Sequence, residues 1–117
     1  MSQHVSRGQV FQANLEPVEG SEQGLTRPVV IVSRNALNQH SPVVVIVPFT
    51  DAANKKRVYL THVRVIPPTG GLTLESLAMC EQIRSISKTR LKKYLGTLDP
   101  ATMTSINAAI KITLDLP

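Results

Sequence analysis

The sequence is poor in the residues that build disulfides, metal sites and aromatic binding platforms. Its 117 residues include one cysteine, Cys80, no tryptophan, two tyrosines and two phenylalanines. A single cysteine excludes an intramolecular disulfide and fits a reducing cytoplasm. The three histidines lie far apart, without the paired spacing typical of zinc ligands, so we expect no metal and no cofactor. So few aromatic residues argue against binding of single strands by base stacking alone.

Long apolar runs are also missing. None approaches the roughly 20 residues needed to span a bilayer, and the first ten residues lack an apolar signal core. We therefore expect a soluble, cytoplasmic protein with no membrane association, folded as one domain over residues 1–117. The 13 lysines and arginines outnumber the 8 acidic residues, which gives a net charge of +5. This charge fits an acidic partner such as nucleic acid, or serves solubility only, and charge alone leaves both alternatives open.

Apolar patterning predicts a mainly β chain that ends in helices. The predicted strands are 7–15, which alternates, the β-branched runs 28–33 and 42–50, the run 58–66, and the second half of 74–86. Ser87 and Gly96 frame a predicted short helix over 87–96, and Asp99-Pro100 opens a helix to about residue 114. The expected fold class is α+β: a small, barrel-like, antiparallel domain with a C-terminal helix.

Two residues at the predicted strand ends could form a phosphate site. Arg27 precedes Pro28, which favours extended backbone, and Thr50 ends the next predicted strand. If the two strands pair antiparallel, the arginine and the hydroxyl meet at one rim, where they could clamp a phosphate. Spacing alone favours another interpretation, in which Arg27 forms a surface ion pair with Glu22. His62 and Cys80 are interpreted as structural residues, the histidine bonded to a neighbour and the cysteine buried.

A set of motifs in fixed order resembles one known family. "RGQVFQANLEPVEGSEQGLTRPVVIVS", "VIVPFT", "THV" and "CEQIRSIS" are similar to the MazF/PemK/Kid endoribonuclease toxins of type II toxin–antitoxin systems. This resemblance runs from Arg7 to about Leu91. It implies an SH3-like barrel that works as a homodimer, cuts single-stranded RNA without a metal and is inhibited by a cognate antitoxin protein.

The resemblance also implies roles for individual residues. It assigns catalysis to Arg27 and Thr50, and makes Glu22 an additional candidate that acts as a base or positions its loop. The residues expected to contact RNA are Ser21, Gln23, Lys55, Lys56, Arg57, Glu81, Gln82 and Arg84. A second basic run over 88–93 is either a further RNA contact or a solvated face.

The chain departs from the family pattern at two places. Leu25 follows Gly24 where the family often has a second glycine, which should stiffen this loop. Kid has a histidine at the position of Ser21 and an Arg-x-Asp pair at the positions of Met79 and Glu81. Because this sequence keeps only the carboxylate of that pair, the Arg27–Thr50 scheme is preferred. The alternative function is a non-enzymatic toxin on the same fold, like the gyrase poison CcdB.

Overall fold

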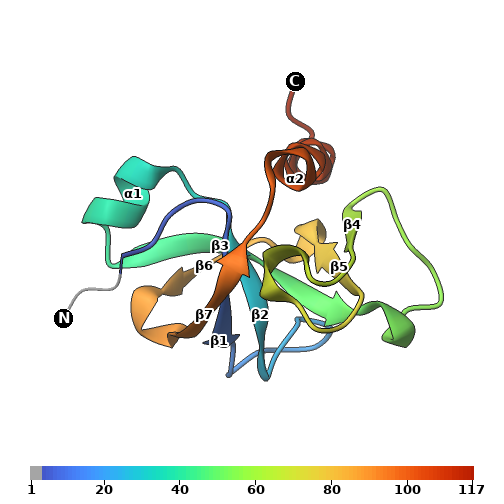
Figure 1. Ribbon diagram of the computed structural model, residues 1–117, viewed down its shortest axis with the longest axis horizontal. Helices are drawn as coiled ribbons and strands as arrows, with labels where there is room; N and C mark the ends of the chain where they lie inside the picture. Colours follow the sequence, from blue (N-terminus) through green and yellow to red (C-terminus); the bar gives the residue numbers. More distant parts are fainter. Residues whose placement is uncertain (1–3) are drawn as a thin grey trace.

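The chain forms a twisted antiparallel sheet with one long helix across it, as the computed structural model shows for residues 4–117 (Figure 1). In chain order the elements are β1 (Gln9–Asn14), β2 (Thr26–Ile31), α1 (Asn35–His40), β3 (Val43–Asp51), β4 (His62–Val65), β5 (Ser76–Met79), β6 (Arg84–Ser87), β7 (Leu91–Thr97) and α2 (Pro100–Leu114). Short 3₁₀ turns lie between several of the strands, among them η3 (Cys80–Gln82).

The sheet is open, which corrects one expectation. The strand order is β4-β5-β3-β2-β1-β7, with β6 paired to the other half of β3. Within residues 4–117 the end strands β4 and β7 form no ladder with each other, so the barrel does not close. The expected α+β class, the antiparallel pairing and the C-terminal helix are confirmed.

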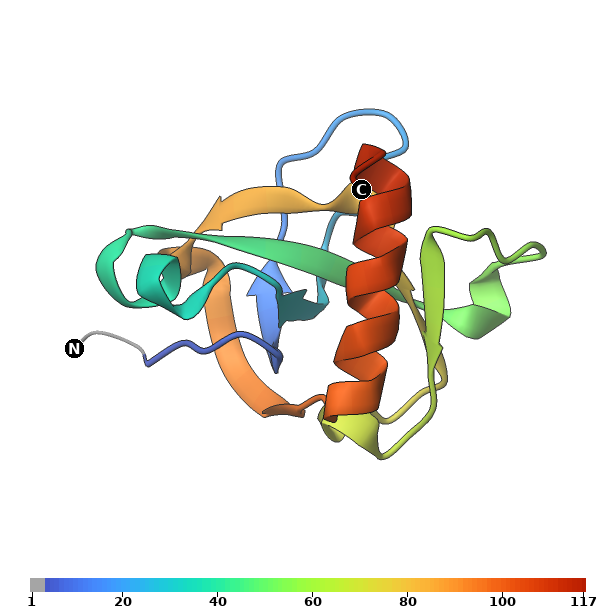
Figure 2. The same cartoon turned by 90° about the horizontal axis from the view of Figure 1, so that it is seen from above.

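Both faces of the sheet are covered by apolar side chains. Val10 lies in one cluster with Ile106 and Ala109. These two residues belong to α2, which crosses the sheet (Figure 2). Phe11 and Leu15 belong to a second cluster. The alternation of neighbouring residues between two clusters follows from the two-residue period of a strand. It confirms the strand predicted within residues 7–15, which the structure bounds as Gln9–Asn14.

Three predicted strand boundaries were wrong. β2 begins at Thr26, so Pro28 lies inside the strand and not at its first residue. β3 pairs with β2 only from Val29 onward, which leaves the proline where β2 has one ladder partner and its missing N–H costs little. The predicted strand 58–66 is reduced to β4, and the segment 74–86 holds a first strand, β5, before the expected second one.

The predicted helix over 87–96 is also wrong. Ser87 does accept a hydrogen bond from the amide of Thr89, but it caps only a 3₁₀ turn at Lys88–Arg90. The rest of the segment is β7, which pairs along most of β1. Leucine and lysine favour helices only weakly, so the unpaired edge of β1 decides the conformation here. The predicted helix from Pro100 is confirmed.

Candidate active site

Arg27 is held at the edge of the sheet by two backbone carbonyls. Its Nε donates to the carbonyl oxygen of Gly24 at 2.6 Å, and its Nη1 donates to that of Phe49 at 3.2 Å. Partial burial lowers the pKa of the guanidinium from its usual value, because the charged form loses solvation. The two bonds fix the plane of the fork, and Nη2 makes no hydrogen bond within residues 4–117.

Thr50 reaches the same place through strand register. β2 and β3 pair Val29 with Pro48, and this register carried two residues outward sets Arg27 opposite Thr50. Both residues line one pocket of about 300 Å³, and Thr50 is only 7% exposed. The expected meeting of the two strand ends is thus present. A charged fork and a hydroxyl in one small pocket can bind two oxygens of a phosphate.

Glu22 is engaged elsewhere. Its Oε1 accepts a hydrogen bond from the backbone N–H of Glu19 at 2.5 Å, within the loop between β1 and β2. Within residues 4–117 the basic–acidic side-chain contacts are His62–Glu81 and Arg64–Glu75, so the ion pair of Glu22 with Arg27 that spacing favoured does not form. Glu22 is also absent from the residues that line the pocket. In this conformation it positions its loop.

Three of the predicted RNA contacts lie together. The side chain of Gln82 accepts from the backbone N–H of Gln23 at 3.3 Å and donates to the carbonyl oxygen of Ser21 at 3.4 Å. These two hydrogen bonds tie the β1–β2 loop to η3, although the two segments lie far apart in the sequence. Because Gly24 follows directly, the loop that Gln82 holds is the one that supplies a carbonyl to Arg27.

Glu81 and Cys80 both lie in η3 and have structural roles. The carboxylate of Glu81 lies 3.0 Å from Nε2 of His62, whose Nδ1 accepts from the backbone N–H of Tyr59 at 3.1 Å. The expectation that His62 is bonded to a neighbour is therefore confirmed. Burial, followed by the charge of Glu81, raises the pKa of the Cys80 thiol to about 12. A neutral buried thiol is no nucleophile, so Cys80 is confirmed as a small core residue.

The basic residues differ in how they are engaged: some are exposed, Arg90 is bonded to backbone carbonyls, and Arg84 is half-buried. Lys56 and Arg57 are exposed on the segment that follows Asn54, which lines the pocket. Arg90, from the later basic run, donates Nη1 to the carbonyl oxygens of Asn14 and Glu16 and so braces the end of β1. Arg84 is half-buried, and its Nη1 has no hydrogen-bond partner among the described residues. Lys56 and Arg57 thus follow a pocket residue in the chain and are exposed, whereas Arg90 is engaged by backbone carbonyls.

Sequence reasoning missed the polar residues in the pocket wall. Gln12 and Asn54 line it, and neither stood out because one lies in a strand and the other in a generic polar loop. Leu74, 57% exposed, adds an apolar surface. The alternation of β1 placed Gln12 on the face of Val10, which was the one available signal.

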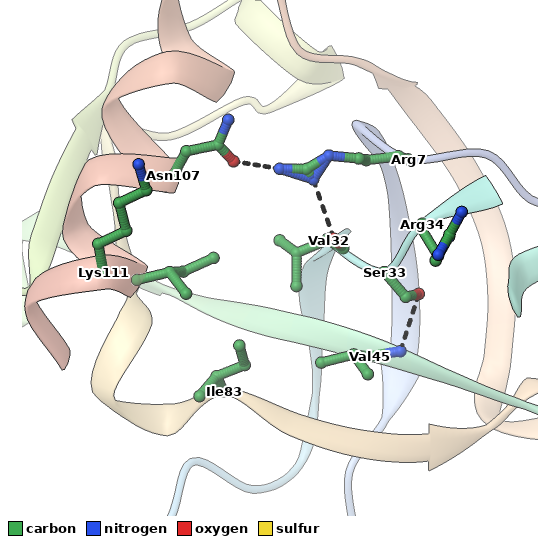
Figure 3. A pocket seen from close by; sticks show the side chains of 9 residues that line it. Arg7, Val32, Ser33, Arg34, Val45, Ile83, Asn107 and Lys111 are labelled. Atoms are coloured by element: carbon green, nitrogen blue, oxygen red, sulfur yellow. Dashed lines mark hydrogen bonds between the residues drawn. The ribbon is translucent and has the colours of Figure 1, made fainter. Parts of the chain in front are cut away.

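A larger cavity of about 510 Å³ lies beside α2 and contains neither Arg27 nor Thr50. Its floor is apolar, with Val32, Val45 and Ile83 among its lining residues (Figure 3). Arg7 crosses it to donate to the carbonyl oxygen of Val32 at 2.9 Å and to Asn107 of α2. This cavity offers packing surface and a tether for the helix. The Ser33 hydroxyl in its lining is already bonded to the side chain of Asn38 and to the backbone N–H of Val45.

Residues 4–117 hold no cluster of three His, Cys, Asp or Glu side chains that could bind a metal ion. In the same part of the chain, no helix is both long and apolar enough to cross a membrane.

Comparison with known proteins decides which family these features belong to. The family model of PemK-like, MazF-like toxins of type II toxin–antitoxin systems matches residues 6–114. The chain belongs to this family. It is similar to a protein named endoribonuclease MazF from Staphylococcus epidermidis, with 40% identity over 112 residues, covering 96% of this chain and 92% of that protein.

Other members of the PemK/MazF family support the assignment. An endoribonuclease MazF from Staphylococcus saprophyticus is 42% identical over 110 residues, which cover 94% of this chain and 91% of the relative. A solved structure of a mycobacterial endoribonuclease in complex with its cognate antitoxin is 34% identical, with a TM-score of 0.79 and 97% of each chain covered. Family membership and fold are therefore both established.

Proposed function

We propose that this protein is a toxin that cuts single-stranded RNA at selected sequences without a metal ion, with Arg27 and Thr50 as its catalytic pair. The observation that carries the proposal is the pocket in which the Arg27 guanidinium and Thr50 lie together. Relatives that bear the name endoribonuclease at 40% and 42% identity support the activity. No observation favours the non-enzymatic, CcdB-like alternative.

The proposed chemistry uses the RNA's own 2′-hydroxyl. Its oxygen attacks the adjacent phosphorus, the bond from phosphorus to the 5′-oxygen breaks, and the products are a 2′,3′-cyclic phosphate and a 5′-hydroxyl end. Negative charge grows on the phosphate oxygens in the transition state, where Arg27 faces it. One cation 4 Å from such a charge, at an effective dielectric of about 20, contributes roughly 4 kcal/mol. This corresponds to about a thousandfold in rate.

Other residues of the site take supporting roles in this scheme. The Thr50 hydroxyl holds a phosphate oxygen, and the Arg27 guanidinium donates a hydrogen bond to the departing 5′-oxygen. Glu22 is the candidate base for the 2′-hydroxyl. To reach the pocket, its carboxylate has to leave the amide of Glu19 that it now binds.

The proposal extends to partners. An acidic antitoxin would bind the basic protein and block the site, as the solved complex of a 34% identical relative with its cognate antitoxin suggests. A homodimer in the cytoplasm is the proposed working form. It is supported by apolar side chains that are exposed at and just after the end of α2: Ile112, Leu114 and Leu116.

RNA cleavage by the purified protein tests the function. We expect wild-type protein to cut a long RNA in the presence of EDTA and to leave 5′-hydroxyl ends. Arg27→Ala should lower the cleavage rate about a thousandfold with an unchanged circular dichroism spectrum. Arg27→Lys is the matched control for charge: it keeps the cation but loses the planar fork that binds two carbonyls, so it should restore only part of the rate.

The contrary results are equally specific. Full cleavage by a folded Arg27→Ala protein would overturn the catalytic assignment. Loss of wild-type activity on adding EDTA would overturn the metal-independent mechanism. Binding of RNA without any cleavage by the wild-type protein would move the function to the non-enzymatic class.

A further inference from the structure

Gln12 is a half-buried polar side chain of β1. It follows Val10 on the same face of the strand, and Val10 is completely buried in the cluster beneath α2. On β2 it lies opposite Pro28, and it lines the pocket that contains Arg27 and Thr50. A leucine here would extend the core, so the glutamine calls for a physical reason.

Among residues 4–117, the carboxamide oxygen of Gln12 has no hydrogen-bond partner. This atom, Oε1, is buried. The residue opposite on β2 is a proline, which has no backbone N–H to offer. An unpaired buried acceptor destabilises a fold. Two other glutamines have protein partners: Gln9 accepts from the backbone N–H of Ser6 at 2.7 Å, and Gln82 clamps the β1–β2 loop.

Because its oxygen is not hydrogen-bonded within residues 4–117, the Gln12 carboxamide is available to bind a ligand. A carboxamide carries one acceptor oxygen and one donor NH₂ group. Since no protein bond to Oε1 has to break, the group can turn and present either end to a ligand in the pocket. Each nucleobase has an edge with a hydrogen-bond donor beside an acceptor, and sequence-specific RNA recognition reads these edges in unstacked bases. The exposed apolar surface of Leu74 in the same wall can support the plane of such a base.

We propose that Gln12 is a specificity-determining residue, which reads the edge of a nucleobase next to the phosphate bound by Arg27 and Thr50. This inference rests on the proposed ribonuclease function and adds a residue to it. RNA binding then pairs the amide that the free protein leaves unpaired. Part of the stability of the free protein is thereby exchanged for discrimination between bases.

Gln12→Leu tests the inference, because leucine has a similar volume and no polar atoms. After the preferred RNA sequence has been mapped, short RNAs with each of the four bases at every position around the cut are compared. We expect the variant to lose about tenfold in the ratio of kcat/KM between the best base and the next at one position, since one base contact is worth roughly that factor. Its melting temperature without RNA should rise by a few degrees, because an unpaired buried oxygen is removed.

Gln9→Leu is the matched control. It makes the same change on the same strand, outside the pocket, at a glutamine that has a protein partner. We expect wild-type base preference and an equal or lower melting temperature. Binding of RNAs with a 2′-deoxy sugar at the cut site is measured alongside, so that base preference is read even where nothing is cleaved.

The outcomes separate the two proposals. Wild-type base preference in Gln12→Leu overturns the inference, and so does an equal loss of preference in Gln9→Leu. A lower melting temperature in Gln12→Leu also contradicts it, because it would mean that the amide has a structural partner. Absence of cleavage by the wild-type protein defeats the proposed function instead, while the 2′-deoxy binding ratios still decide the role of Gln12.

Discussion

Arg27 owes its geometry to atoms that are distant in the sequence. The Arg-Pro step predicts an extended backbone and a strand, and both are present. The direction of the guanidinium, however, depends on carbonyl oxygens of Gly24 and Phe49. The ion pair with Glu22, which looks reasonable from spacing, fails because the Gly24 carbonyl lies closer to Nε and Glu22 caps its own turn.

Leu25 is the most strained residue that the structure describes in this loop. Its φ of +62° is a conformation that glycine adopts freely and leucine does not. The backbone is held there from both sides: its N–H donates to Oε1 of Glu16 at 2.6 Å, and its carbonyl oxygen accepts from the N–H of Leu15 at 3.0 Å. The side chain, 66% exposed, gains little from packing. This geometry supports the expectation of a stiff loop beside Arg27.

We expect Leu25→Gly to stabilise the protein by about 1 kcal/mol, because relief of the left-handed backbone outweighs the lost chain entropy. Thermal unfolding followed by circular dichroism measures it. Gly20→Ala, at φ +56° with open space around it, is the control with the opposite sign and should destabilise by a similar amount. An unchanged or lower melting temperature in Leu25→Gly would contradict the strain.

At the scale of elements, the segment between β3 and β4 joins the pocket to a basic surface. Asn54 lines the pocket, and Lys55, Lys56 and Arg57 follow it directly. Arg57 lies over the ring of Tyr59, 5.9 Å from its centre, and the backbone of Tyr59 is anchored on His62. The predicted RNA contacts of this segment therefore lie on a loop whose end is held in place by the contacts of Tyr59.

Removal of the three charges together, Lys55→Ala, Lys56→Ala and Arg57→Ala, should weaken RNA binding without changing base preference. The slope of log affinity against log salt is negative, and each lost phosphate contact on a single strand reduces its magnitude by about 0.7. We therefore expect the slope to become less steep by roughly 2. Binding measured between roughly 50 and 300 mM salt gives the slope. Arg64→Ala, which removes a cation already paired with Glu75, is the control and should leave the slope unchanged.

The whole molecule leaves an apolar surface on its helix uncovered. Ile112 and Leu116 are 52% and 53% exposed at the end of α2, and the cavity of about 510 Å³ adjoins the same helix (Figure 3). In the proposed homodimer, a second copy of the chain covers this surface. Burial of apolar side chains is the driving force expected for such an interface.

Sedimentation analysis should therefore give twice the mass of one chain for the wild-type protein. The double variant Ile112→Glu, Leu116→Glu should dissociate into folded monomers, since it places charges on the proposed contact surface. Leu60→Glu, at an 80% exposed position between β3 and β4, should remain dimeric. A wild-type monomer at micromolar concentration, or a dimeric double variant, would exclude this interface.

Local pattern alone determined much of this protein. The alternation in β1, the β-branched runs of β2 and β3, and the Asp99-Pro100 start of α2 are readable from the sequence because each reports a local period or cap. The motifs around Arg27 and Thr50 also sufficed to identify the family.

Tertiary structure decided the rest. β7 is a strand because it pairs with the edge of β1, although its leucines and lysines fit a helix. The sheet stays open because the end strands β4 and β7 do not meet. The pocket joins Gln12, Arg27, Thr50 and Asn54, which no sequence period links, since strand register and loop hydrogen bonds bring them together. Local preferences thus defined most elements, whereas long-range pairing assembled the site.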